Sequence, residues 1–128
     1  MARLLVDSHV LLWHVLDDSR LGPKPTAAIE AVDAQVLVST ASLWEIAIKA
    51  GLGKLDAPAD LPERVQQLGF GLLPVTAEHA WQVRHLPPLH RDPFDRLLIA
   101  QAQVEQLPIV TADPSFDSYD VTVVWDSA

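Results

Sequence analysis

The sequence predicts an α/β fold in which helices cover both faces of a parallel sheet. Five short, almost wholly apolar runs alternate with segments whose apolar residues recur at helical spacing, which is the pattern of strands buried on both faces. Ten prolines punctuate the whole chain instead of collecting in one linker. The length of 128 residues suits a single domain, residues 1–128, that can bury a core without disulfides.

The predicted strands are apolar and mostly rich in β-branched residues. The series begins with RLLVD and continues with QVLV, GLLPV, PIVT and VTVVW. Pro74 limits the third of these runs, because proline has no backbone N–H to donate to a neighbouring strand. The five predicted strands cover residues 3–7, 35–38, 71–75, 108–111 and 121–125.

The predicted helices begin and end at recognisable residues. Val10 and Trp13 lie at helical spacing after the first strand. Gly51 stops the third helix, and Thr76 is suited to cap the fifth. Asp92 and the proline after it start the longest helix, with a cap followed by proline in the first turn. The six predicted helices cover residues 9–16, 26–34, 40–50, 61–68, 76–85 and 92–106.

The charge balance is strongly acidic, with 17 acidic against 9 basic side chains and a net charge of -8. Such a chain is not built to bind nucleic acid through its overall charge, because the usual footprint is a basic patch. A role on nucleic acid would require local basic residues or metal ions that turn acidic clusters into cation sites. The same excess of acid suits a basic protein partner.

The absence of cysteine excludes disulfides, thiolate zinc sites, iron–sulfur clusters and a cysteine nucleophile. No apolar run approaches the ~20 residues that a membrane span needs. Near the start, Asp7 and His9 interrupt a short apolar stretch, which therefore lacks the core of a signal peptide. We expect a cytoplasmic protein with no membrane association.

Carboxylates cluster around the ends of the predicted strands. Asp7 ends the first strand, Glu45 lies in the first turns of the helix after the second, and Asp113 lies just beyond the fourth. Asp92 and Asp95 open the long helix that leads into the fourth strand. Because ligands of open parallel sheets bind beyond the carboxyl ends of the strands, we expect these acids to share one rim.

Acids gathered at one rim predict a metal site. Crowded carboxylates resist ionisation unless a cation lies among them. Hard oxygen ligands with open water positions suit Mg²⁺ or Mn²⁺. Such an ion can activate water and stabilise charge on a phosphoryl oxygen. The chemistry that this pattern predicts is metal-assisted hydrolysis of a phosphodiester.

Each acid also has a structural explanation. Asp7 could cap the helix that follows it. The segment from Ser42 to Glu45 fits a capping box, and Glu45 with Lys49 forms an i,i+4 pair worth only ~0.3 kcal/mol. Asp92 and Asp113, each followed by proline, suit a helix start or a turn. On pattern alone, the structural and the catalytic interpretations both stay open.

Other polar side chains are weaker candidates. Thr111 could orient a water in the site, although hydroxyl groups of this kind more often cap helices. Arg91, Arg96 and Lys49 could contact phosphate groups near the rim, whereas exposed charges are by default part of a solvated face. The four tryptophans could stack on bases, but packing in a core or an interface is the default for most of them.

Four segments together resemble a known family. They are LLVDSHVLLWHV, STASLWEIAIKAGLGKL, LPPLHRDPFDRLLIAQA and TADPSF, and they closely resemble the PIN-domain proteins, specifically the VapC-type toxins of toxin–antitoxin systems. The resemblance covers essentially the whole chain in the right order. It implies a three-layer α/β/α sandwich with a central parallel sheet, an Mg²⁺- or Mn²⁺-dependent endoribonuclease toxin acting on cellular RNA, a cognate antitoxin that blocks the acidic rim, and a homodimer.

The resemblance also implies roles for particular residues. Thr111 becomes the hydroxyl associated with the last acid, and Asp92 becomes an extra supporting acid or helix cap in a loop that carries more charge than the plain family pattern. The implied catalytic and metal-binding acids are Asp7, Glu45, Asp95 and Asp113.

Two other functional classes stay open beside the nuclease. One is a non-catalytic, PIN-like binding module whose acids only cap helices. The other is an Mg²⁺-dependent phosphatase or phosphotransfer domain on a similar sheet. A dehalogenase-type phosphatase needs a second aspartate two residues beyond Asp7, where this chain has His9, and a receiver domain needs a late lysine, whereas no lysine follows Lys54.

Overall fold

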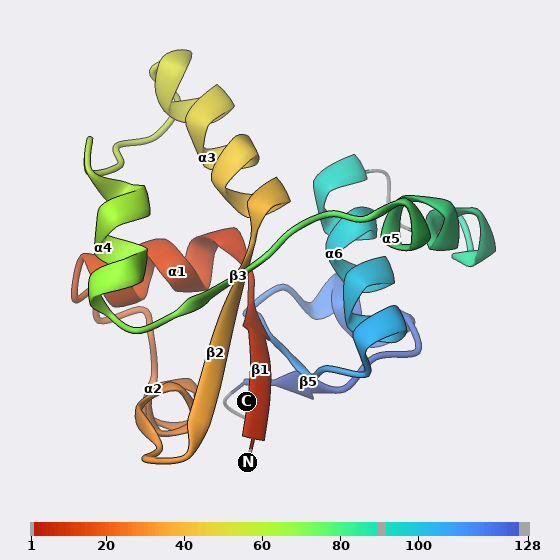
Figure 1. Ribbon diagram of the computed structural model, residues 1–128, viewed down its shortest axis with the longest axis horizontal. Helices are drawn as coiled ribbons and strands as arrows, with labels where there is room; N and C mark the ends of the chain where they lie inside the picture. Colours follow the sequence, from red (N-terminus) through yellow and green to blue (C-terminus); the bar gives the residue numbers. More distant parts are fainter. Residues whose placement is uncertain (1, 90–91, 126–128) are drawn as a thin grey trace.

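The computed structural model describes residues 2–89 and 92–125. Within them, a five-stranded, all-parallel sheet has the order β3-β2-β1-β4-β5 (Figure 1). The strands are β1 (Ala2–Val6), β2 (Ala34–Ser39), β3 (Gly71–Leu73), β4 (Ile109–Val110) and β5 (Val123–Val124). The helices are α1 (Ser8–Val15), α2 (Pro23–Glu30), α3 (Thr40–Gly51), α4 (Leu61–Gln67), α5 (Ala77–Gln82) and α6 (Pro93–Glu105), with 3₁₀ helices η1 (Val83–His85) and η2 (Pro114–Ser118). None of the helices in these ranges is long and apolar enough to cross a membrane.

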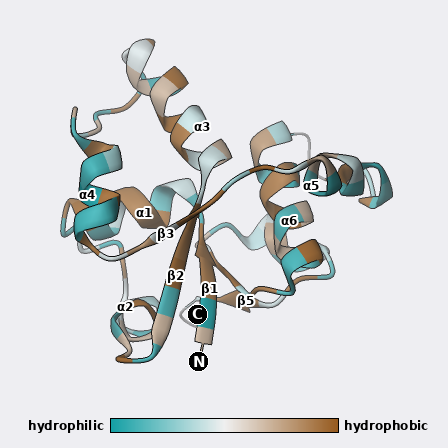
Figure 2. Ribbon diagram, viewed as in Figure 1, coloured by the Kyte–Doolittle hydropathy of each residue, from teal (hydrophilic) through white to brown (hydrophobic). Residues whose placement is uncertain are grey.

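Helices lie on both faces of the sheet, and the predicted three-layer α/β/α sandwich is confirmed. Figure 1 shows α1, α2 and α4 on one side of the central strands and α5 and α6 on the other. Successive strand residues point to opposite faces. Leu4 and Val6 of β1 therefore join one buried cluster, while Leu5 between them joins another. In Figure 2 the hydrophobic colour is concentrated along β2 and neighbouring strands, whereas α4 is largely hydrophilic.

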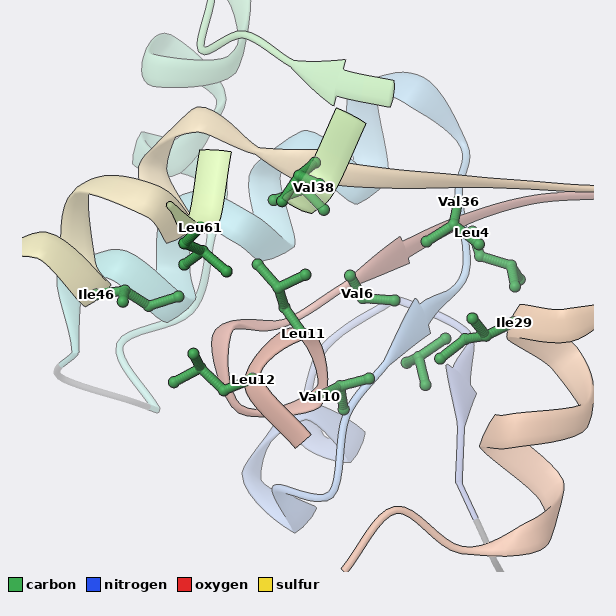
Figure 3. Close-up of a cluster of buried hydrophobic side chains, with 12 residues drawn as sticks. Leu4, Val6, Val10, Leu11, Leu12, Ile29, Val36, Val38, Ile46 and Leu61 are labelled. Atoms are coloured by element: carbon green, nitrogen blue, oxygen red, sulfur yellow. The ribbon is translucent and has the colours of Figure 1, made fainter. Parts of the chain in front are cut away.

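The first buried cluster joins β1 and β2 to the helices α1 to α4. In the parallel register, Leu4 lies opposite Val36 and Val6 lies opposite Val38. Figure 3 shows side chains from all four helices converging on these strand residues, with Leu11 of α1 among them. Complete burial of a side chain of this kind contributes about 1.5–3 kcal/mol. This cluster holds α1 and α3, which carry site residues, against the sheet.

The second buried cluster lies on the opposite face, under α6. Leu5 lies opposite Ile109 of β4, and both are fully buried. Ile99 of α6 and Phe116 of η2 pack in the same cluster. This cluster fixes α6, whose first turn carries Asp95, relative to the end of β4.

The strand order places a topological switch beside β1. The chain proceeds from β1 to β2 and β3 on one side, then returns to β4 and β5 on the other. The backbone N–H of Asp7 donates to the carbonyl of Val110 at 3.1 Å, which ties the end of β1 to the end of β4. In open parallel sheets, ligands bind at the carboxyl ends of strands around such a switch.

Several elements differ in extent from the prediction. The helix expected over 26–34 begins at Pro23, which suits the first helical turn, and ends before Ala31, whose ψ of 139° is extended. The strand expected over 71–75 ends before Pro74. The segment 76–85 is helical as expected, but its last turn is the 3₁₀ helix η1. The last two strands keep only the two-residue stretches that find a partner strand.

Candidate active site

Asp7 lies at the switch point and is almost completely buried, with 6% of its surface exposed. It follows β1 directly and caps α1, since its Oδ1 accepts from the backbone N–H of Val10 at 2.8 Å. Its Oδ2 accepts a hydrogen bond from the hydroxyl of Thr111. The structural interpretation of Asp7 as a cap is therefore correct, and the same side chain occupies the edge where the ligand of such a sheet binds.

The environment of Asp7 disfavours its negative charge. Burial raises the pKa of the Asp7 carboxyl above its ordinary value, and the charge of Glu45 raises it further. Hydrogen bonds from Thr111 and Val10 and the proximity of His9 act in the opposite direction. Burial is the largest of these effects, so a cation beside Asp7 would relieve an unfavourable charge.

Glu45 is the second buried acid, also 6% exposed. It lies on α3, where the hydroxyl of Ser8 donates to its Oε1 at 2.6 Å and the ammonium of Lys49 lies 2.7 Å from its Oε2. The predicted i,i+4 pair is thus confirmed. The capping-box alternative is wrong, because α3 begins three residues earlier and Ser39 is its cap, accepting from the N–H of Ala41 at 3.1 Å.

Thr111 and Asp113 come from the loop after β4. Thr111 is 1% exposed; besides donating to Asp7, its Oγ1 accepts from the backbone N–H of Asp113 at 3.1 Å. The carboxylate of Asp113 caps η2 by accepting from the N–H of Ser115 at 2.9 Å. Thr111 therefore connects the ends of β1 and β4. Its hydroxyl also holds the backbone N–H of Asp113 close to the carboxylate of Asp7.

The two acids at the start of α6 act on the same region. Asp92 caps the helix, and its Oδ1 accepts from the N–H groups of Phe94 at 2.8 Å and Asp95 at 3.1 Å. The pKa of the Lys49 ammonium is raised, first by its hydrogen bond with Glu45 and further by the charges of Asp92 and Asp95. The acids of α6 thus contribute to the negative potential around Lys49.

An aromatic contact holds α3 and α6 together beside these acids. The rings of Trp44 and Phe94 meet edge to face, with their centroids 5.2 Å apart. Such pairs contribute ≈ 0.5–1.5 kcal/mol beyond the area they bury. Because Trp44 precedes Glu45 and Phe94 precedes Asp95, this contact links the helical turns that carry the two acids.

The predicted phosphate-contact residues have different surroundings. Lys49 lies at the site, as described. The guanidinium of Arg96 donates to the carbonyl of Pro87 at 2.9 Å, with longer contacts to the carbonyl of Leu86 and the hydroxyl of Tyr119, both at 3.4 Å. This arrangement favours a structural role for Arg96 in holding the segment before α6. Arg91 lies outside the described residues.

The donor set fits a hard divalent cation whose shell is completed by water and substrate. In the described part of the chain, no three carboxylate or histidine side chains form a ready-made metal site. The structure does bring Asp7 and Glu45 close enough for their charges to interact. Mg²⁺ is usually bound by one or two protein carboxylates, with waters and substrate phosphates as its other ligands. The two buried carboxylates therefore suit Mg²⁺ or Mn²⁺.

Ser8 is a site residue that the sequence analysis missed. It is buried, and its short hydrogen bond orients the carboxylate of Glu45 across 37 positions of sequence separation. Its position directly after Asp7 at the first turn of α1 was the available signal, because that position faces the same sheet edge. The partner on α3 becomes evident only when the two helices are packed.

The chain is a doubly wound α/β protein with two buried carboxylates, Asp7 and Glu45, at the switch point of its parallel sheet. The family model for the PIN domain matches residues 4–121. The chain belongs to the PIN-domain family, which confirms the family resemblance found in the sequence. No curated protein matches the chain in sequence.

Solved structures share this fold at low sequence identity. VapBC2 from Rickettsia felis, bound to a DNA fragment from its promoter, is similar with a TM-score of 0.71 and 12% identity over 94% of this chain and 96% of that one. A toxin–antitoxin complex from Klebsiella pneumoniae is similar with a TM-score of 0.66 and 17% identity, over 95% of this chain and 96% of that one. FitAcB from Neisseria gonorrhoeae is similar with a TM-score of 0.59 and 22% identity, over 94% of this chain and 95% of that one. At these identities, the similarity concerns the fold.

Proposed function

We propose that this protein is a metal-dependent endoribonuclease, the toxin of a VapC-type toxin–antitoxin system, which hydrolyses phosphodiester bonds in cellular RNA. The observation that carries the proposal is the pair of buried carboxylates, Asp7 and Glu45, at the switch point of a PIN-family sheet. A buried acid pair of this kind is unfavourable by itself. Lys49 contacts Glu45 at 2.7 Å, whereas burial still disfavours the charge of Asp7, so a cation held by both acids would supply the compensation that Asp7 lacks.

The chain's own residues organise this site. Asp7 and Glu45 would hold Mg²⁺ or Mn²⁺, with Asp95 and Asp113 assisting directly or through water. When bound, the ion would supply an activated water and neutralise charge that develops on the phosphate. Thr111 fixes the orientation of Asp7, and the hydrogen bond from the hydroxyl of Ser8 fixes that of Glu45, so both acids are oriented before an ion arrives.

RNA binding by this acidic chain depends on the cation. A net charge of -8 repels a polyanion, so the ion has to offset the acids before a backbone phosphate can approach. We propose that Arg91 and Lys49 contact the RNA backbone near the rim, with Asp92 as a supporting acid. The cytoplasm, where RNA and a newly made antitoxin both occur, is the location that this function requires.

A protein partner is the second part of the proposal. The known toxin–antitoxin complexes that share the fold support a cognate antitoxin here. The net charge of -8 favours a basic inhibitory segment. The side chains of Trp44, Ile48 and Leu52 are 61%, 38% and 64% exposed. Trp44 and Ile48 lie one helical turn apart on α3, and Leu52 is its C-cap one further turn along; we propose that this apolar face supports a homodimer of single-domain subunits, residues 1–128.

Cleavage assays test the catalytic proposal. A structured RNA is incubated with the protein in Mn²⁺ or Mg²⁺, in EDTA, and with the variants Asp7→Asn and Glu45→Gln. We expect cleavage only by the wild-type chain with metal, and a loss of at least ~10²-fold in the variants, the scale of one removed electrostatic contributor. Undiminished cleavage by Asp7→Asn would remove Asp7 from the mechanism.

A non-catalytic binding module is the second candidate, because Asp7, Asp92 and Asp113 each cap a helix. A module of this kind needs no ion. Thermal unfolding in Mn²⁺ separates the two functions: a nuclease of the proposed type gains stability from the ion by mass action, whereas a pure binding module gives the same transition with and without it.

A further inference from the structure

We propose that Lys49 is an exchangeable counter-ion of the acidic site, whose ammonium neutralises Glu45 in the metal-free protein and is displaced when a divalent cation binds. The inference rests on the proposed function, since it assumes that the acids hold a metal. It adds a role for Lys49 that is distinct from contact with RNA. The lysine would set how tightly the site binds its ion.

The ammonium of Lys49 occupies the position beside Glu45 that a bound metal ion would otherwise take. Nζ of Lys49 is 2.7 Å from Oε2 of Glu45, whereas Oε1 is occupied by the hydroxyl of Ser8 at 2.6 Å. The hydroxyl of Ser8 is neutral, so it does not compensate for the negative charge of Glu45. The positively charged ammonium of Lys49 does. A divalent ion that coordinates Oε2 therefore meets a positive charge already bound to that oxygen.

The two partners of this ion pair differ in freedom to move. The side chain of Glu45 is 7% exposed and is held by α1 and α3, while that of Lys49 is 36% exposed. A lysine side chain has a flexible four-carbon stem, so its tip can turn into solvent without moving the helix. The structure thus allows the cation to leave while the acid stays in place.

The surrounding charges make Lys49 the compensating cation for more than one acid. Asp92 and Asp95 also act electrostatically on Lys49, and Asp7 interacts with Glu45. Of the two buried acids, Glu45 is the one whose carboxylate forms an ion pair within the described residues, and its partner is Lys49 at 2.7 Å. Removal of the Lys49 ammonium leaves the buried acids without this positive charge, and the affinity of the site for another cation therefore rises.

Direct measurement of Mn²⁺ binding tests the inference. The dissociation constant of Mn²⁺ for the full chain is measured by calorimetric titration, for wild type, Lys49→Met and the control Lys54→Met. Lys54 is exposed, follows the end of α3, and makes no ion pair in the described part of the chain. Both variants change the net charge equally, so the difference in Mn²⁺ affinity between them reports the local interactions of Lys49 with Glu45 and the neighbouring acids.

We expect Lys49→Met to bind Mn²⁺ about tenfold more tightly than wild type, the size of a charged hydrogen bond that no longer has to be broken, while Lys54→Met stays within about twofold. In EDTA, Lys49→Met should unfold at a lower temperature than wild type, and Mn²⁺ should raise its transition more. Equal or weaker Mn²⁺ binding by Lys49→Met would overturn the inference and leave the proposed nuclease intact. Absence of Mn²⁺ binding in wild type and variants alike would overturn the metal site itself.

A second pair of variants keeps the test valid if the methionine variant does not fold. Lys49→Gln removes the charge but retains a donor for Glu45, and it should bind Mn²⁺ more tightly than wild type. Lys49→Arg retains the charge and should bind Mn²⁺ much as wild type does. If glutamine and arginine gave the same affinity, the charge of Lys49 would have no influence on the ion, and the proposal would be wrong.

Discussion

Replacing Asp7 by asparagine separates the two roles of this side chain, helix cap and acid. Asparagine has nearly the same shape, and as an N-cap it accepts the N–H of Val10 as well as aspartate does. It removes a charge that burial and Glu45 both disfavour. We therefore expect Asp7→Asn to lose RNA cleavage and, in the absence of metal, to be more stable than the wild-type protein.

The size of the gain follows from the contacts of Asp7. Relief of a buried charge beside another acid stabilises by roughly 2 kcal/mol. The hydroxyl of Thr111, which now donates to Oδ2, has to find another acceptor at a cost of roughly 1 kcal/mol. Asparagine keeps the helix cap, so the free energy of unfolding changes by only a few tenths of a kcal/mol on this account. The net gain is about 1 kcal/mol, or about 4 °C in Tm for a chain of this size.

Calorimetry in EDTA as a function of pH checks this prediction. The pKa of Asp7 is raised above 3.8 in the folded protein, so the folded state retains the proton longer than the unfolded state does. Wild type then loses stability relative to the variant as the pH rises from about 3.8 through the folded pKa. The advantage of Asp7→Asn should be present at pH 7 and shrink toward pH 4. A variant less stable than wild type at pH 7, or a stability advantage independent of pH, would show that the charge of Asp7 is not destabilising in the folded protein.

Three other substitutions test the scaffold, the hydroxyl bridge and the apolar face. Thr111→Val removes the donor to Asp7 and the acceptor for the N–H of Asp113. Chemical denaturation should show that the free energy of unfolding falls by about 1–3 kcal/mol. An unchanged free energy of unfolding would mean that the hydroxyl bridge is unimportant. Leu5→Ala, at a fully buried position of the central strand, should cost about 2–5 kcal/mol, whereas a loss below ~1 kcal/mol would contradict the packing of the second cluster. Leu52→Glu, at the exposed C-cap of α3, should convert the proposed dimer to monomer in light scattering without changing Tm of the monomer by more than ~2 °C. A dimer that persists would place the interface elsewhere.

Much of the fold could be predicted from local patterns. β2 and α3 lie within a residue or so of their predicted bounds, because a β-branched run and a capped apolar helix are encoded by neighbouring residues. α6 was equally predictable, since Asp92 and Pro93 supply its cap and first turn. β4 and β5 were predicted too long, because the extent of a parallel ladder is decided by how many residues find a partner.

The candidate site was predictable in part. Asp7 and Glu45 were predictable because the carboxyl ends of parallel strands meet at one edge; in the structure both are buried, and the charge of Glu45 acts on Asp7. The capping-box alternative for Glu45 is inconsistent with the helix start predicted at residue 40, and the structure rules it out because Ser39 caps α3. Ser8 was missed because its partner is 37 residues away on another helix, and no local pattern identifies such a contact.

Local sequence features specify an acidic, cysteine-free α/β chain of the PIN family, with acids at strand ends and helix starts. These properties depend on composition, periodicity and capping, which neighbouring residues specify. Packing of the helices establishes which acids become buried, which hydroxyl groups orient them, and that Lys49 lies 2.7 Å from Glu45 and neutralises it. Those properties depend on burial and on distances between segments remote in sequence, and both arise only when helices pack on the two faces of the sheet.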